Sequence, residues 1–319
     1  MISIHKEHKG YLFFIYILAI LSMLLWGMTF VWSKIVFKYY SPITTIFLRL
    51  IISSIILFIF IFITKKTEKI KKEDYKLFLF SALFNPFLYF IGESYGIKLT
   101  SSTISAVIIA TIPLFTPIAA YFTLKEKLSR LNILGLIISF SGILLMILNK
   151  NFSLNASPYG IAWLLFAVIT AVFYAIILKK LTNKYSPITI ISVQNLIGAF
   201  YFLPLFLIFD YNDFIHIRPN TELISNLLQL SIFGSSIAFV CFTIAVRELG
   251  VSKANIFSNF IPIFTAIFSY FILSEAFNMN KIAGMIIVVI GVMLSQINKK
   301  GKIFNFYRFF YKKRNIRKL

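Results

Sequence analysis

The sequence predicts an all-α membrane protein of ten transmembrane helices, arranged as two inverted five-helix repeats. Three observations predict this fold: an apolar composition, apolar segments of about 20 residues, and one stretch that occurs twice. Of the 319 residues, 59% are hydrophobic and 13% are charged, and the mean hydropathy is +0.86. Soluble domains carry about 25% charged residues. The composition therefore indicates an integral membrane protein.

The duplicated stretch occupies residues 111–128 and again residues 260–277. The two copies are TIPLFTPIAAYFTLKEKL and FIPIFTAIFSYFILSEAF, at an offset of 149. A shared preference for apolar residues does not explain why a proline, a threonine, a tyrosine and a glutamate also align. An internal duplication explains it, and the motif Ser-Pro-Ile-Thr at 41–44 and 186–189 extends it. The aligned pairs are Pro113/Pro262, Thr116/Thr265, Tyr121/Tyr270 and Glu126/Glu275.

Ten apolar segments near the length of a bilayer span are separated by lysine-rich or turn-forming connections. They cover residues 11–32, 43–63, 77–97, 103–124, 131–148, 159–178, 188–209, 223–246, 254–273 and 282–297. The first segment starts like a signal peptide, but its apolar run is too long and no small-residue cleavage site follows. We therefore expect it to be the first span. The two longest connections, residues 65–76 and 210–222, are expected to be solvated loops.

The distribution of Lys and Arg predicts the orientation. With the N-terminus inside, 25 basic residues fall in cytoplasmic segments and 6 in outward-facing ones. Cytoplasmic connections are enriched in Lys and Arg, so both termini are expected in the cytoplasm, in a multi-pass protein of the inner or plasma membrane. Five spans per repeat is an odd number, so the second repeat enters from the opposite side and the repeats are inverted. The predicted units are residues 1–148, 149–298 and a basic tail, 299–319, on the inner leaflet.

The net charge of +21 does not indicate nucleic-acid binding, because the basic residues lie between apolar segments and in the tail. The lipid bilayer is the expected partner. The sequence contains no phosphate-binding loop of an ATP-driven pump and no cluster of catalytic or metal-ligating side chains. We therefore expect no enzyme activity, no cofactor and no metal. A carrier for a small molecule is favoured, with a membrane scaffold or receptor and a membrane-embedded enzyme as the alternatives.

Two charged residues lie within predicted spans, Arg49 in the second and Glu93 in the third. Both fall in the predicted outer half, so we expect that they can meet. An arginine at a helix centre costs about 2.5–3.5 kcal/mol on insertion scales, so an ion in the membrane indicates a function or a partner. A structural pair that joins two helices is the alternative to a substrate-facing role. Glu93 is also the candidate for proton coupling.

Two prolines mark the fourth and ninth spans. Pro113 and Pro262 each remove a backbone donor and free a carbonyl group one turn earlier, which a cavity tolerates and lipid does not. Prolines at matching positions of two halves point to the binding site of a secondary transporter. Interhelical hydrogen bonding or packing is the alternative role for each polar or aromatic neighbour. The candidates for the substrate pathway are Trp26, Thr29, Arg49, Tyr89, Glu93, Thr111, Pro113, Tyr174, Ser235, Asn255, Asn259 and Pro262.

Small residues and paired glutamates recur outside these candidates. Gly135 and Gly142, with the twins Gly284 and Gly291, form a small-residue stripe on the fifth and tenth spans. Such a stripe permits close helix contact, either as scaffold or as the face of a homodimer. The glutamates Glu126 and Glu275 are expected to anchor loops at the ends of the fourth and ninth spans.

The ten predicted spans carry a set of recognisable residues at fixed places, namely Trp26-Gly27, Lys34, Pro42, Arg49, Pro113, Glu126, Pro262 and Glu275. Together with the inverted repeat, these residues resemble the EamA-type transporters of the drug/metabolite transporter superfamily, over nearly the whole chain apart from the tail. The resemblance implies a carrier, commonly an exporter of amino acids or other small metabolites. It also implies a central cavity built from the first, third, fourth, sixth, eighth and ninth helices. Ala171 replaces an expected tryptophan-like residue, so the two gates are expected to be unequal.

Overall fold

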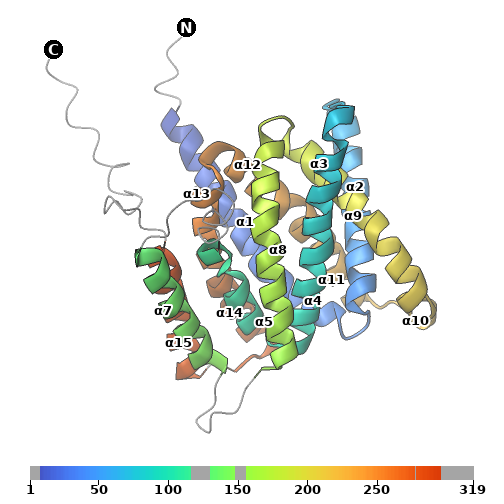
Figure 1. Ribbon diagram of the computed structural model, residues 1–319. Helices are drawn as coiled ribbons and strands as arrows, with labels where there is room; N and C mark the ends of the chain where they lie inside the picture. The colour runs from blue at the N-terminus through green and yellow to red at the C-terminus, as the bar shows by residue number, and fades with distance from the viewer. Residues whose placement is uncertain (1–7, 116–129, 148–155, 277, 296–319) are drawn as a thin grey trace, which may run out of the picture.

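The computed structural model describes residues 8–115, 130–147, 156–276 and 278–295, and its regular structure within these ranges is helical. Seven of the described helices are long and apolar enough to cross a membrane. Three shorter apolar helices, Ser102–Phe115, Ile133–Ile147 and Met279–Ser295, account for the other predicted segments. The expected all-α fold with ten apolar helices is therefore confirmed. The helices form one bundle, with α7 and α15 side by side at its edge (Figure 1).

The first repeat contains three long spans and two shorter helices. Its third span is interrupted by a π-helical segment that contains Asn85 and Pro86, where the backbone of Asn85 is not helical. A proline inside a helix removes a backbone donor, which accounts for this break. The elements are α1 (His8–Val36), α2 (Pro42–Ile63), η1 (Lys72–Asp74), α3 (Tyr75–Ala82), η2 (Leu83–Leu88), α4 (Tyr89–Leu99), α5 (Ser102–Ile109) and α7 (Arg130–Ile147).

The second repeat follows the same order with different interruptions. The expected loop at 210–222 is wrong in its first part, because the seventh span continues as helix to His216. Asp210 binds the start of α2 through Ser41 and Thr44, which ties this extension to the bundle. The elements are α8 (Pro158–Thr182), α9 (Pro187–Leu205), η3 (Phe206–Asp210), α10 (Tyr211–His216), α11 (Thr221–Gln229), η4 (Leu230–Ala238), α12 (Phe239–Leu249), α13 (Val251–Ile256), η5 (Phe257–Phe260), α14 (Ile261–Leu273) and α15 (Met279–Ser295).

Duplicated sequence features form matching local structures. Ser41 and Ser186 are both N-caps whose hydroxyl oxygens accept from the backbone N–H three residues later, and a proline follows each one. Serine at the N-cap with proline in the first turn is a favourable helix start. The fourth and ninth spans both break and restart one residue before a buried proline, Pro113 or Pro262. The two repeats therefore share their helix starts and their breaks.

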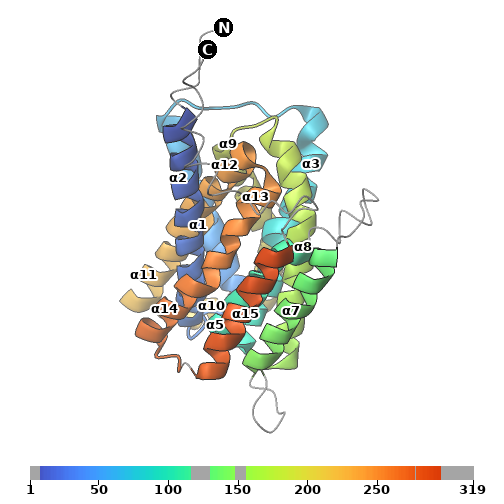
Figure 2. The same ribbon diagram turned by 90° about the vertical axis from the view of Figure 1, so that its left-hand side faces the viewer.

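The glycine stripe brings α7 and α15 into close contact within the chain (Figure 2). A Cβ atom added to Gly142 would lie 2.7 Å from the carbonyl oxygen of Gly284. One added to Gly291 would lie 2.7 Å from the carbonyl oxygen of Gly135. Small residues allow membrane helices to approach this closely. The stripe therefore serves as internal scaffold, and its glycine face is not available to a second copy.

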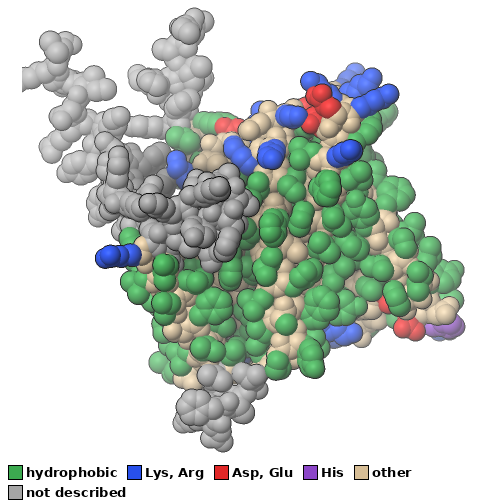
Figure 3. Space-filling view, viewed as in Figure 1, with side chains coloured by type: hydrophobic (Ala, Val, Ile, Leu, Met, Phe, Trp, Pro, Cys, Tyr) green, Lys and Arg blue, Asp and Glu red, His purple; other side chains and the backbone are tan. Residues whose placement is uncertain are grey.

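The outer surface has an apolar middle. Hydrophobic side chains cover the centre of the face in Figure 3, and Lys and Arg side chains gather toward its upper end. Many large apolar side chains are exposed, among them Phe62 at 80% and Ile208 at 72%. Water would penalise this exposure, whereas the hydrocarbon core of a bilayer accepts it. The exterior thus fits the membrane location that the composition predicts.

Candidate functional site

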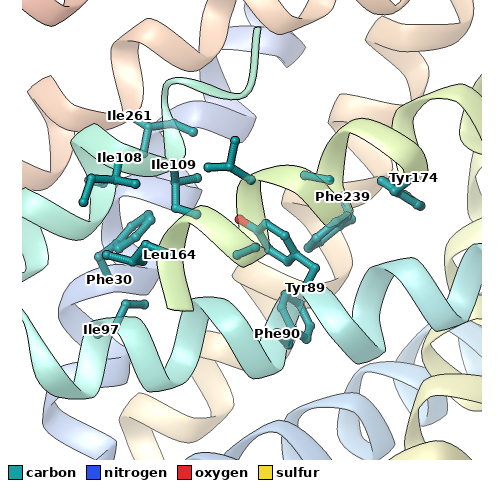
Figure 4. Packing of buried hydrophobic residues seen from close by; sticks show 14 of the residues in the cluster. Phe30, Tyr89, Phe90, Ile97, Ile108, Ile109, Leu164, Tyr174, Phe239 and Ile261 are labelled. Atoms are coloured by element: carbon teal, nitrogen blue, oxygen red, sulfur yellow. The ribbon is translucent and has the colours of Figure 1, made fainter. Parts of the chain in front are cut away.

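A cavity lies between the two repeats, with about 800 Å³ of empty space when its open part is included. Its walls come from α1, α2, η2, α4 and α5 of the first repeat and from α8, α12, α13, η5 and α14 of the second. Tightly packed apolar side chains surround it, and Figure 4 shows Tyr89, Tyr174 and Phe239 among them. Ligand sites in membrane carriers occur at such interfaces between repeats.

Arg49 supplies the positive charge of this cavity and is only 3% exposed. Its Nε atom donates to Ser235 Oγ at 2.8 Å, and its guanidinium carbon lies 4.3 Å from the ring centre of Phe90. An arginine over an aromatic face gains a cation–π attraction. Among the described residues, no side chain or backbone oxygen accepts a hydrogen bond from the Nη atoms. Ser235 therefore holds the guanidinium at Nε, and the Phe90 ring packs against its face. The edge that carries the two Nη atoms is left for the cavity, which Arg49 lines.

Glu93 lines the same cavity and is 7% exposed. Its Oε1 atom accepts a hydrogen bond of 2.8 Å from the Tyr89 hydroxyl group, one helical turn earlier. The described part of the chain contains four ion pairs within 4.0 Å, and none of them joins Glu93 to Arg49. The expectation that the two side chains meet is therefore only partly right. They face one hollow without direct contact, which does not fit a structural salt bridge between helices.

Ser235 lies behind Arg49 instead of on the cavity wall. It belongs to the π-helical segment η4, and such segments often occur at functional sites. Its carbonyl oxygen accepts from Asn195 Nδ2 at 3.0 Å, and the same amide nitrogen lies 2.7 Å from Ser53 Oγ. Ser53 is in turn 2.6 Å from the hydroxyl oxygen of Ser236. This network fixes the position of Ser235, which accepts the hydrogen bond from Arg49. Ser235, a predicted pathway candidate, therefore supports the Arg49 side chain and does not itself line the cavity.

The twin position of Arg49 carries Gln194, which has a matching partner. Gln194 Nε2 donates to Ser81 Oγ in α3, and its Oε1 accepts from the Tyr174 hydroxyl group at 3.4 Å. Tyr174 lines the cavity, and Gln194 does not. The cavity wall near Gln194 therefore contains the uncharged Tyr174 side chain, whereas the wall near Arg49 contains the two ionisable side chains Arg49 and Glu93.

The ninth span contributes unpartnered amides. Asn255 lines the cavity, and Asn259, although equally buried at 6% exposure, does not. The amide nitrogen of Asn255 and both polar side-chain atoms of Asn259 have no hydrogen-bond partner among the described residues. A spacing of four residues would place the pair on one face of a regular α-helix, but the 3₁₀ segment η5 starts between them. Buried amides without partners are costly, so they suit a site that water or a ligand completes.

Three candidates of the duplicated stretch do not reach the cavity. The Thr111 hydroxyl group donates to the Ile108 carbonyl oxygen at 2.6 Å, and Thr111 is buried. Pro113 and Pro262 are buried too, but their neighbours Ile112 and Ile261 form the wall. The prolines restart their helices, and the side chain that faces the cavity is the one before each proline.

Trp26 and Thr29 are the candidates that α1 brings to the cavity wall. Both line the cavity, and the Thr29 hydroxyl group donates to the Trp26 carbonyl oxygen at 2.7 Å. The Trp26 ring centre lies 4.9 Å from those of Phe239 and Phe242. These two phenylalanines, and Phe90, line the cavity but are absent from the predicted set. With 37 phenylalanines in the chain, residue type alone could not single them out.

Glu275 acts as the sequence predicts for a loop anchor. Its carboxylate accepts from the backbone N–H of Ser102 and from the Thr103 hydroxyl group, both at 2.7 Å. It thereby caps the start of α5 in the other repeat, and it does not line the cavity. The candidates Thr116, Tyr121 and Glu126 and the basic tail 299–319 lie outside the described residues.

Comparison with known proteins identifies the family. The profile of the EamA-like transporter family matches residues 13–148 and again residues 158–296. The chain belongs to the EamA-like transporter family. Two EamA units on one chain confirm the duplication, and membership of a transporter family excludes the scaffold and enzyme alternatives.

Relatives of this EamA protein are named as transporters without a stated substrate. It is 27% identical to the uncharacterized transporter YetK of Bacillus subtilis over 257 residues, 79% of this chain and 78% of the relative. It is 25% identical to an uncharacterized transporter of Archaeoglobus fulgidus, with 88% and 97% covered. A solved crystal structure at 14% identity covers 89% of this chain and 98% of its own, with a TM-score of 0.65, and supports the fold.

The cavity agrees with what the EamA resemblance implies about its walls. All six expected helices contribute, and Arg49 adds the second span to them. Trp26 and Ala171 both line the cavity, one from each repeat. At this pair of matching positions, the first repeat contributes an aromatic side chain and the second repeat contributes a methyl group.

Proposed function

We propose that this EamA protein is a secondary transporter that moves amino acids or other small metabolites by alternating access, in the direction of export. The observation that carries the proposal is the cavity between the repeats, whose wall contains the buried Arg49 and Glu93. Neither side chain forms an ion pair within 4.0 Å among the described residues. In this mechanism the inverted halves rock about a central site. The location proposed for it is the inner or plasma membrane.

The extent of the cavity supports a state open to the cytoplasm. Its walls run from Arg49 and Glu93 to Leu178, Val246 and Val251. The last three lie near the ends of α8 and α12 and at the start of α13, close in sequence to the basic residues 179, 180 and 247. The excess of Lys and Arg at this end favours the cytoplasmic side. We therefore propose cytoplasmic termini and a substrate that enters from inside.

Glu93 is the proposed coupling group. It is the one carboxyl group on the part of the cavity wall that the structure describes, and a proton on it changes the charge that the substrate encounters. Protonation at one side of the membrane and release at the other would link the pH gradient to transport. Tyr89 can accept or donate at the hydroxyl group that now binds Glu93, so either protonation state has a partner.

Flux into proteoliposomes tests the proposal. The purified protein is reconstituted, a panel of metabolites is offered, and uptake is measured with and without an imposed pH gradient. We expect saturable flux of at least one solute, and we expect Glu93→Gln to lose the part driven by the pH gradient. An absence of flux across the panel contradicts transport, and an unchanged response of Glu93→Gln to the gradient contradicts coupling through Glu93.

A further inference from the structure

We propose that the substrate carries a carboxylate group that binds the free edge of the Arg49 guanidinium, and that Glu93 takes up a proton when this carboxylate binds. The inference rests on the proposed transport function and adds the substrate class and the charge balance of the site. It is carried by the way Arg49 is held and by the number of charges on the cavity wall.

The guanidinium group of Arg49 is oriented but incompletely satisfied. Ser235 Oγ accepts from Nε, and the Phe90 ring lies against the guanidinium face, so both the plane and the direction of the group are set. The Nη atoms have no acceptor among the described residues, at a side chain that is only 3% exposed. A buried charged donor without acceptors is costly. The site is thus preorganised for an acceptor that arrives through the cavity.

A carboxylate matches this free edge. The two Nη groups donate in parallel, in the spacing that binds the two oxygens of a carboxylate. A phosphate monoester also fits a guanidinium, but it carries nearly two negative charges at neutral pH. Arg49 is the one basic side chain on the described cavity wall. One cation balances one carboxylate, so the cavity favours a monocarboxylate over a phosphate.

The rest of the wall indicates an apolar body for this ligand. Trp26, Phe239 and Phe242 form an aromatic group on one side, and Ile109 and Ile112 lie on another. Burying apolar surface contributes about 25 cal/mol per Å². A small carboxylate with an aromatic or aliphatic body can therefore bind the cation at one end and the apolar wall at the other.

The charge balance of the cavity explains why Glu93 would take up a proton when a carboxylate binds. With no ligand bound, an ionised Glu93 would offset the charge of Arg49, which lines the same cavity. A bound carboxylate would leave two anions for one cation in a poorly hydrated space, unless one of them is neutralised. Besides Glu93, the titratable groups on the described cavity wall are Arg49 on α2, Tyr89 on α4 and Tyr174 on α8. The described wall residues of α1, α5, α12, α13 and α14 bring no further titratable group.

Proton uptake has a measurable consequence through linkage. If one proton binds with each carboxylate, the affinity rises about tenfold for each pH unit of acidification, while Glu93 is ionised in the empty protein. Glutamine at position 93 imitates the neutral acid. We expect Glu93→Gln to bind the carboxylate tightly and without this pH dependence.

Ligand-induced thermal stabilisation of the full chain in lipid nanodiscs tests the inference. The probes share one skeleton and differ in charge: 3-phenylpropionate, 3-phenylpropanamide and 3-phenylpropylamine, with phenethyl phosphate as the dianion. We expect 3-phenylpropionate to bind at least about tenfold more tightly than the amide, the amine and the phosphate, in line with a charge-assisted bidentate contact. Stabilisation by the amide or the amine at equal concentration, or none by 3-phenylpropionate, overturns the assignment.

Three variants distinguish the loss of the contact between Arg49 and the ligand carboxylate from a general loss of stability. Arg49→Gln places the residue of the twin position at the site and is expected to lose the preference for the carboxylate over the amide. Arg218→Gln makes the same change at an exposed position and is expected to keep it. If Arg49→Gln does not fold, Ser235→Ala keeps the charge and is expected to weaken 3-phenylpropionate binding several-fold. Undiminished carboxylate binding in Arg49→Gln, or in Ser235→Ala where Arg49→Gln does not fold, overturns the inference.

The pH dependence of 3-phenylpropionate binding tests the proton step, and solute flux in proteoliposomes tests the substrate class. Binding of 3-phenylpropionate that is independent of pH in the wild type, or equally pH-dependent in Glu93→Gln, overturns the proton step. Flux of neutral or cationic solutes alone in proteoliposomes leaves the transport function standing and overturns the carboxylate inference. An absence of any flux overturns the transport function itself.

Discussion

Arg49 donates from Nε to Ser235 Oγ at 2.8 Å, and this bond joins the second span of the first repeat to the third span of the second repeat. The twin contact runs from Gln194 to Ser81 and joins the second span of the second repeat to the third span of the first. The two repeats thus carry the same kind of bond at matching positions. One bond holds a charge and the other holds a neutral amide, so the site is symmetric in position and asymmetric in charge.

Ser235→Ala is predicted to destabilise the protein, because it leaves the buried Arg49 Nε without its acceptor. A hydrogen bond to a charged group contributes about 1.5–3 kcal/mol, so a decrease of several degrees in melting temperature is expected. The measurement is thermal unfolding in the same detergent or nanodisc. Ser225→Ala is the matched control, since this hydroxyl group donates to the Glu222 carbonyl oxygen of its own helix in a solvent-exposed hydrogen bond. Equal melting temperatures for the two variants would show that the Arg49 contact does not stabilise the fold.

Gly142→Ala is predicted to separate α7 from α15. The added Cβ atom would lie 2.7 Å from the Gly284 carbonyl oxygen, and backbone must move to relieve this contact. Overpacking of this kind costs about 1–3 kcal/mol. Gly10→Ala makes the same change in α1 where no atom lies within 4 Å, and alanine favours helix there. We expect a lower melting temperature for the first variant alone, and comparable values would contradict the close contact.

The duplicated motifs allowed much of the fold to be predicted, because proline and serine act locally. A Ser-Pro pair starts a helix through its own hydroxyl group and ring, whatever packs around it, so both helix starts were predictable. A glycine stripe in the sequence predicts that another helix packs closely against it, but it does not identify that helix. In the structure, the stripe on α7 packs against the matching stripe on α15 of the same chain.

The site was predictable by residue type more than by role. Arg49 and Glu93 stand out because charge is rare in a membrane span. The function of Ser235 as a support for Arg49 was not predictable, since it depends on which helix face turns toward α2 in the π-helical segment. Asn255 and Asn259 differ in cavity contact because a 3₁₀ turn changes the helical period between them. Helical spacing alone would have placed them together.

Glu275→Gln is predicted to lower stability without changing transport. The carboxylate caps α5 through Ser102 and Thr103, and an anion at a helix N-terminus contributes about 0.3–1 kcal/mol, up to about 2 when partly buried. Glutamine keeps one acceptor and loses the charge. Glu93→Gln is the matched comparison, the same chemical change on the cavity wall. We expect the first variant to shift the melting temperature and the second to abolish the flux driven by the pH gradient. A coupling defect in Glu275→Gln would contradict its role as an anchor.

Lys184→Met is predicted to lower the melting temperature slightly at neutral pH and to have no effect at high pH. Lys184 Nζ lies 2.6 Å from Asp74 Oδ1, and this hydrogen bond raises the pKa of Lys184 above its ordinary value of 10.5. A raised lysine pKa means that the folded state binds the proton more tightly than the unfolded state. The stabilisation is therefore fully present below pH 10.5 and is lost as the pH rises through the raised pKa.

The solvent exposure of Lys184 limits the expected change in melting temperature and guides the choice of the control variant. The Lys184 side chain is 49% exposed, so solvent and salt screen the pair and the effect is small. Thermal unfolding of the wild type and of Lys184→Met, measured from about pH 8 to about pH 12, gives the difference between their melting temperatures. Lys180→Met removes an exposed lysine of the same helix end and is the control. A difference that persists undiminished at the highest pH would show that Lys184 stabilises the protein through its methylene groups and not through Asp74.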